Sequence, residues 1–166
     1  MTIDLSGDWT GHYEQDGGRH GLSMHVAQRG QSFVGAMRDV DTLMAGREVL
    51  HARAADGSQQ PEIIGEAEVL SSLPEHSTIE GEVEGRLVTF VKSYQGKSST
   101  NVWVPGRAKL QFESPGHQVN YRGTLDATGT ELTGHWTIPP KHGGLVLRDR
   151  FLLRRVAKPD LGPTTS

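Results

Sequence analysis

The sequence predicts an all-β protein, a single antiparallel up-and-down β-barrel of roughly eight to ten strands. Glycine makes up 21 of the 166 residues, about twice its ordinary share of roughly 7%. Many glycines stand two positions from a bulky residue, which places both on one face of a strand. Turn-forming residues separate these stretches at intervals typical of an all-β chain. A tapering barrel interior needs this alternation of small and large side chains.

The alternation recurs along most of the chain, and it sets the expected strands in order. Its clearest examples are Gly7, Trp9, Gly11 and Tyr13; Phe33, Gly35 and Met37; Ile79, Gly81, Val83 and Gly85; Tyr121, Gly123 and Leu125; and Leu132, Gly134 and Trp136. The expected strands cover Leu5–Glu14, Leu22–Gln28, Ser32–Asp39, Glu62–Val69, Thr78–Glu84, Leu87–Tyr94, Ala108–Phe112, Val119–Leu125, Glu131–Ile138 and Leu147–Val156.

Short glycine- or proline-containing sequences separate many of these strands. Asp16-Gly17-Gly18 and Arg29-Gly30 follow the first two strands, and Glu84-Gly85-Arg86 joins the fifth to the sixth. Ser114-Pro115-Gly116 and Ala127-Thr128-Gly129 play the same part later. Glycine supplies positive φ and proline a fixed φ, so each sequence favours a tight antiparallel connection.

Residues 41 to 53 allow two readings. Asp41 is a candidate helix N-cap, and a short helix over residues 41–50 would follow it. Gly46 would cost such a helix about 1 kcal/mol, and Val49 to Arg53 reads equally well as a strand. The helix and the strand stay open as alternatives.

Gln95 to Gly106 is expected to be a long hairpin loop, and loops of this length often carry function. Trp103 lies in it, just before Pro105, which favours a role in covering the barrel mouth. From residue 157 onward there is little apolar surface to bury. We therefore expect one domain, a barrel over residues 1–156, followed by a flexible C-terminal tail over residues 157–166.

Composition excludes several classes of function. Lys and Arg number 17 against 20 Asp and Glu, a net charge of −3, so we expect no nucleic-acid partner. The absence of Cys removes disulfides, thiolate nucleophiles and Cys-based metal sites. The eight His residues lack the spacing of metal ligands. We expect neither a metal nor another cofactor.

The N-terminal residues lack both the cationic start and the apolar run of a secretory signal. The strongly apolar stretches are far shorter than the roughly 18 residues that span a bilayer. We therefore expect a soluble, cytoplasmic protein that does not bind membranes.

The segment Leu5-Ser6-Gly7-Asp8-Trp9-Thr10, followed by Gly30-Gln31-Ser32-Phe33-Val34-Gly35-Ala36-Met37, resembles the start of avidins and lipocalins. This resemblance implies a calycin-type barrel in which Trp9 packs at the closed end beneath Arg154 or Arg155. Avidins have polar biotin contacts where this chain has Gly11 and Met37, so biotin binding is not implied. Gly7-Asp8-Trp9-Thr10-Gly11 is also similar to the start of the haem-binding nitrobindin barrels, which implies haem as an alternative ligand.

Lys92 is the most distinctive candidate for a binding residue. Val88, Phe90, Lys92 and Tyr94 share one strand face, so an inward Lys92 near the open end would fix a carboxylate or phenolate. The plainer reading is a lysine that extends to solvent at the rim. The full set of candidate ligand-binding residues is Tyr13, Phe33, Met37, Phe90, Lys92, Tyr94, Trp103, Tyr121 and Trp136.

These residues favour a barrel that binds a small, largely apolar molecule by burial, with Lys92 and a tyrosine hydroxyl selecting its orientation. Three alternatives stay open: a cofactor-free cyclase or isomerase, a haem-binding barrel, and a self-associating structural module. The sequence favours binding over catalysis, since no nucleophile elbow or phosphate loop is present. It leaves a homo-oligomer open.

Overall fold

The protein is all-β, as expected. A computed structural model describes residues 3–40, 42–52, 62–103, 109–139 and 146–157, without the side chains of residues 44–52 and 62–67. Within these ranges the chain forms strands and their connections and no helix. No described helix therefore has the length and apolar character needed to cross a membrane. Residues 158–166, most of the expected tail, lie outside the described ranges.

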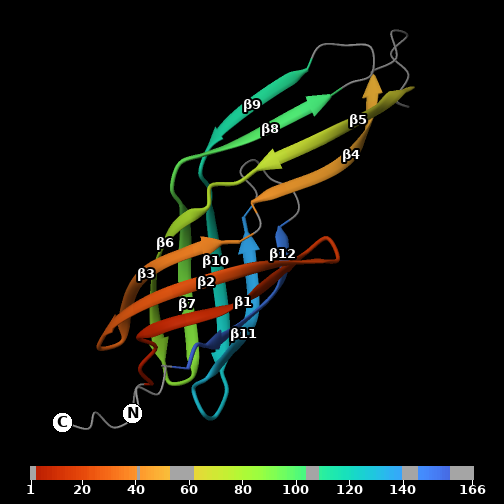
Figure 1. The fold of residues 1–166 in the computed structure, drawn as a ribbon. Helices are drawn as coiled ribbons and strands as arrows, with labels where there is room; N and C mark the ends of the chain where they lie inside the picture. Colours follow the sequence, from red (N-terminus) through yellow and green to blue (C-terminus); the bar gives the residue numbers. More distant parts are fainter. Residues whose placement is uncertain (1–2, 41, 53–61, 104–108, 140–145, 158–166) are drawn as a thin grey trace, which may run out of the picture. The chain divides into compact units, whose positions relative to one another are not determined.

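Eight strands form a closed antiparallel barrel in the order β1-β12-β11-β10-β7-β6-β3-β2 (Figure 1). Neighbours in the barrel follow one another in the chain except after β3 and β7, and β1 closes the circle by pairing with β12. The up-and-down barrel predicted from the sequence is thus confirmed. Its strands are β1 (Gly7–Gln15), β2 (Gly18–Arg29), β3 (Ser32–Asp39), β6 (His76–Glu84), β7 (Leu87–Tyr94), β10 (Gln118–Leu125), β11 (Glu131–Ile138) and β12 (Leu147–Arg155).

Two hairpins outside the barrel form a second, four-stranded sheet with the order β4-β5-β8-β9. They are β4 (Leu43–Ala52) with β5 (Glu62–Ser72), and β8 (Lys97–Trp103) with β9 (Leu110–Pro115). The barrel and this sheet belong to two separate compact units of the chain.

The second sheet decides one alternative that the sequence left open and corrects one expectation. Residues 43–52 form a strand and not a helix, because ten residues of β4 pair with β5 and satisfy the backbone there. Residues 97–103 form β8 and not a loop, because both neighbours, β5 and β9, pair with it. The polar run from Ser98 to Asn101 hid this strand, although polar side chains also pair across strands, as Ser71 and Thr100 do at 3.3 Å.

The glycines that suggested a barrel lie where neighbouring strands approach closely. A Cβ atom at Gly11 would meet the carbonyl oxygen of Leu152, and one at Gly134 would meet that of Arg122. Neither position has room for a side chain. Glycine therefore lets neighbouring backbones approach as closely as the strongly bent strands of a small barrel require.

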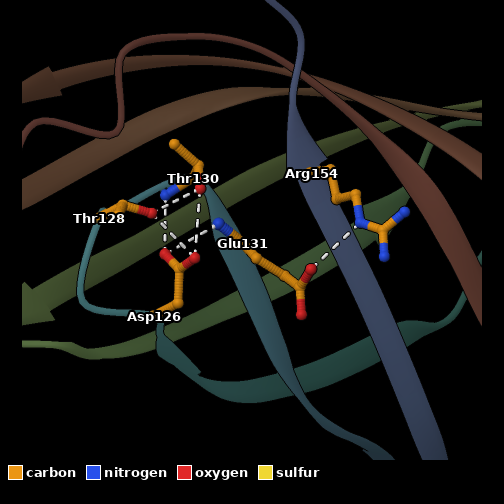
Figure 2. A network of polar contacts seen from close by, with 5 residues as sticks. All are labelled: Asp126, Thr128, Thr130, Glu131 and Arg154. Atoms are coloured by element: carbon orange, nitrogen blue, oxygen red, sulfur yellow. Dashed lines mark hydrogen bonds and ion pairs between the residues drawn. The ribbon is translucent and has the colours of Figure 1, made fainter.

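The turn between β10 and β11 is fixed by the carboxylate of Asp126 (Figure 2). Its Oδ1 accepts hydrogen bonds from the backbone N–H groups of Thr130 at 2.8 Å and Glu131 at 3.1 Å. Its Oδ2 accepts from the hydroxyl of Thr128 at 3.0 Å and that of Thr130 at 3.2 Å. Bonds to the charged form, led by the one from Glu131, lower the pKa of Asp126 to about 2.

Candidate functional site

The barrel interior has two chemically different ends. Strands β1, β3, β7 and β11 finish at the same end at which β2, β6, β10 and β12 begin. Near that end, the polar end, the interior side chains include Tyr13, Asp39, Ser77, Lys92 and Trp136. The closed end is apolar apart from one arginine, and its residues include Leu5, Trp9, Leu125, Leu132 and Arg155.

The closed end is plugged by Trp9, whose side chain is fully buried. The indole Nε1 donates to the carbonyl of Leu5 at 2.9 Å. The guanidinium of Arg155 lies 4.6 Å from the ring centre and donates to the carbonyls of Ser6 at 2.9 Å and Asp4 at 2.6 Å. This group satisfies the backbone oxygens of the entering chain and keeps water off the indole.

Of the two arginines considered for that position, Arg155 lies over Trp9. Arg154 points to the outer face, where its side chain is exposed and pairs with Glu131 at 3.1 Å (Figure 2). The alternation along β12 explains the difference, because adjacent residues of a strand face opposite sides.

At the polar end, Lys92 forms an ion pair with Asp39. The Nζ atom of Lys92 donates to Oδ1 of Asp39 at 2.5 Å, and neither side chain has any exposed surface. Burial lowers the pKa of Lys92, while the charge and hydrogen bond of Asp39 act in the opposite direction. The site thus places a cationic donor and an anionic acceptor side by side in a dry interior.

Aromatic rings surround this pair. The Nζ atom of Lys92 lies 5.8 Å from the ring centre of Tyr13. That ring stacks on His20 at 4.9 Å and meets Trp136 edge to face at 6.3 Å. Burial, followed by the charge of Asp39, raises the pKa of Tyr121 well above its ordinary value, so its hydroxyl stays protonated.

Side chains fill the middle of the barrel. Phe90 stacks on Tyr121 with ring centres 4.7 Å apart, and Phe151 meets Tyr121 edge to face at 5.0 Å. Phe33 and Met37 lie at 3% and 1% exposure in the same interior. The described interior is therefore a packed core, and the convergent polar groups lie at one end of it.

Seven of the nine candidate ligand-binding residues lie together inside the barrel: Tyr13, Phe33, Met37, Phe90, Lys92, Tyr121 and Trp136. Tyr94 ends β7 and is buried, with its ring 4.8 Å from that of His117. Trp103 does not join this group. It lies in β8 of the four-stranded sheet, 39% exposed, with Nζ of Lys109 5.2 Å from its ring centre.

Sequence reasoning missed Asp39, which occupies the position beside Lys92 that we had expected a ligand carboxylate to fill. The signal was present, since Asp39 continues the inward spacing of Phe33, Gly35 and Met37. A polar residue at a strand end looks like the start of a turn, and the partner Lys92 is 53 positions away in the chain. The pairing of the two therefore depends on the positions of β3 and β7 on either side of β6.

The outer face of the barrel has a hollow of its own, which we call the outer hollow. Its volume is about 1720 Å³, and outward-facing side chains of β1, β6, β7, β10, β11 and β12 line most of it. His12 and His135 lie here, on the outer face that their spacing predicts. Nowhere in the described ranges do three His, Asp or Glu side chains gather as a metal site would require.

Comparison of the chain with models of known protein families and with curated proteins found no match. The barrel and the buried ion pair must therefore carry any argument about function on their own chemistry.

Proposed function

We propose that this protein binds a small, largely apolar molecule with one neutral polar group, at the polar end of the barrel. The observation that carries the proposal is the Lys92–Asp39 pair, which has no exposed surface. A buried ion pair is usually no more stabilising than apolar residues of the same volume. Buried ionisable groups cluster at functional sites, and a binding site accounts for this pair better than core packing does.

The chemistry of the pair favours a particular polar group. Lys92 donates hydrogen bonds and Asp39 accepts them, so an amide or a hydroxyketone satisfies both at once. A charged ligand would have to displace one partner of the pair and leave the other uncompensated. The rings of Tyr13 and Trp136 beside the pair suit a flat or aliphatic body.

Two further features support a calycin-type binder. The barrel has eight strands, a number at which the interior holds side chains or one small ligand. The Trp9–Arg155 plug matches the closed end that the resemblance to lipocalins implies. The filled middle of the barrel limits the ligand to a size that the polar end accommodates.

Calorimetric titration with three naphthalene probes tests the proposal. Naphthalene-2-carboxamide carries the neutral donor and acceptor, 2-ethylnaphthalene lacks any polar group, and 2-naphthoate carries a charge. We expect wild type to bind the amide at least about tenfold more tightly than either of the others. This preference disappears in the double variant Lys92→Met, Asp39→Val.

A matched control removes the exposed pair of β8 and β9, Lys97 and Glu113, which are 3.9 Å apart. The variant Lys97→Met, Glu113→Val keeps the preference for the amide. Equal affinity for all three probes, or loss of the preference in the control as well, contradicts the proposal. So does a wild type that binds none of them and carries no ligand in native mass spectrometry.

A second candidate function, self-association, rests on β9. In the described residues this strand pairs only with β8 and lies at the edge of its sheet. Leu110 and Phe112 are 50% and 56% exposed there, and exposed apolar edge strands pair with other copies. Light scattering of Leu110→Lys, Phe112→Lys against wild type tests this, and equal masses for both would exclude β9 as the contact.

A further inference from the structure

The outer hollow carries three basic side chains in a row across neighbouring strands. Arg122 of β10 pairs directly with His135 of β11, and His135 pairs directly with Arg150 of β12. Directly opposite residues on one sheet face have Cβ atoms about 4.5 to 5.5 Å apart. Arg122, His135 and Arg150 are all exposed, so their ends reach the same volume above β11.

The two arginines of this row lie on either side of His135. No ion pair in the described ranges joins Arg122 or Arg150 to a carboxylate. Two other arginines of the hollow are paired, since Arg19 lies 3.8 Å from Glu14 and Arg154 lies 3.1 Å from Glu131. A third, Arg148, lies opposite Thr137 in the next row and adds to the positive charge there. The positive charge of the row is therefore available to an anion from outside the chain.

From this charge and geometry we propose that the outer hollow binds a small organic phosphate, with the phosphate group above His135 between Arg122 and Arg150. Guanidinium groups bind phosphate through paired hydrogen bonds. Neutral donors surround the place, because Arg122 lies directly opposite Thr89 on its other side, and the next row holds Asn120 opposite Thr137. The hollow, at about 1720 Å³, has room for a phosphate with an organic body.

The surrounding charges favour a small anion over a polyanion. Glu14, Glu80 and Glu82 also line the hollow and would repel a chain of phosphates running across it. The whole protein carries a net charge of −3, so it has no long-range field to attract nucleic acid. A single phosphate above β11 contacts the row without reaching Glu80 and Glu82 on β6, from which β7 and β10 separate it.

Calorimetry at low ionic strength with phenyl phosphate, inorganic phosphate and a short single-stranded DNA tests the proposal. We expect phenyl phosphate to bind wild type more tightly than the other two. The variant Arg122→Gln, Arg150→Gln weakens its binding at least about tenfold. The thermal unfolding midpoint of this variant stays the same, because both arginines are exposed and neither is in an ion pair.

The control variant Arg29→Gln, Lys97→Gln removes the same number of positive charges at exposed positions outside the hollow, and it keeps phosphate binding. The variant Lys92→Met, Asp39→Val keeps phosphate binding too. The proposal for the outer hollow and the proposal for the polar end of the barrel are therefore tested independently. Three results overturn the proposal: no binding of phenyl phosphate to wild type, equal weakening in the charge-matched control, or tighter binding of inorganic phosphate or DNA than of phenyl phosphate.

Discussion

Separating Lys92 from Asp39 by mutation gives the sharpest test of how the polar end is built. Both side chains are fully buried, so solvent screening does not reduce the effect of removing either one. Removing one partner of such a pair typically costs 3–5 kcal/mol of stability, whereas replacing both by apolar residues is often neutral or stabilising. The variants are Lys92→Met, Asp39→Val and the combination of the two.

The size of each effect follows from the charge left behind. In Lys92→Met the buried carboxylate must be protonated, which at pH 7 costs about 4 kcal/mol for a group that ordinarily titrates near 3.9. In Asp39→Val the lysine must lose its proton, which costs about 4.6 kcal/mol at pH 7 for a group that ordinarily titrates near 10.4. These values are upper limits, because water or a neighbour that solvates the charge lowers them.

The two single variants should respond to pH in opposite directions. The loss in Lys92→Met shrinks to about 1.5 kcal/mol at pH 5, where protonating a carboxylate is easier. The loss in Asp39→Val shrinks to about 2 kcal/mol at pH 9, where a lysine gives up its proton more easily. Burial already lowers the pKa of Lys92 in the wild type. The loss of the lysine proton expected in Asp39→Val is a change in the same direction.

Urea unfolding of the four proteins at pH 5, 7 and 9 measures these differences. We expect the double variant to lie within about 1 kcal/mol of wild type at every pH, so the coupling energy at pH 7 is close to the sum of the two single losses, about 6 kcal/mol or more. Single variants that each lose less than about 1 kcal/mol, or that change with pH in the same direction, would refute a buried ion pair.

Three further predictions concern the barrel wall and its closed end. Asp126→Asn lowers the urea midpoint at pH 7. Because the pKa of Asp126 is about 2 in the folded protein, the wild type's advantage is present above pH 4 and is lost as the pH falls through 2. Curves that stay apart well below pH 2 would contradict this. Gly134→Ala destabilises the barrel by about 1 to 3 kcal/mol or prevents folding, since the added Cβ meets the carbonyl of Arg122, while Thr133→Ala on the outer face changes stability little. Arg155→Met lowers stability by about 1 to 3 kcal/mol through lost bonds to backbone carbonyls, against less than about 1 kcal/mol for the exposed Arg154→Met; thermal denaturation of the two variants compares them, and equal losses would remove the special role of Arg155.

The barrel could be predicted from the sequence because the pattern that indicates it lies within single strands and turns. Gly11, Gly35 and Gly134 each stand between two bulky inward residues, and the turns at Gly17 and Gly85 use positive φ, so neighbouring residues contain most of the information. The second sheet was harder to read. The strand β8 is polar, and one of its two partners, β5, lies in another hairpin of the chain.

One of the two residues of the ion pair, Lys92, could be predicted for the same reason. The phase of Phe90, Lys92 and Tyr94 along one strand put Lys92 inside, as observed. Its partner Asp39 comes from another strand, and the row formed by Arg122, His135 and Arg150 depends on the register of three strands. Spacing within one strand predicts which face a residue takes, whereas register between strands requires the folded structure.

The order of the barrel strands determines which parts of the chain are free to vary. Apart from the β1–β12 seam, every barrel neighbour is also a neighbour in sequence once the two hairpins between β3 and β6 and between β7 and β10 are set aside. Both hairpins are inserts into an eight-stranded meander, and each doubling of an insert's length costs only about 0.6 kcal/mol in chain entropy. Inserts that leave and rejoin the wall at one rim can lengthen, shorten or change sequence over evolution while the Trp9 plug at the opposite rim stays intact.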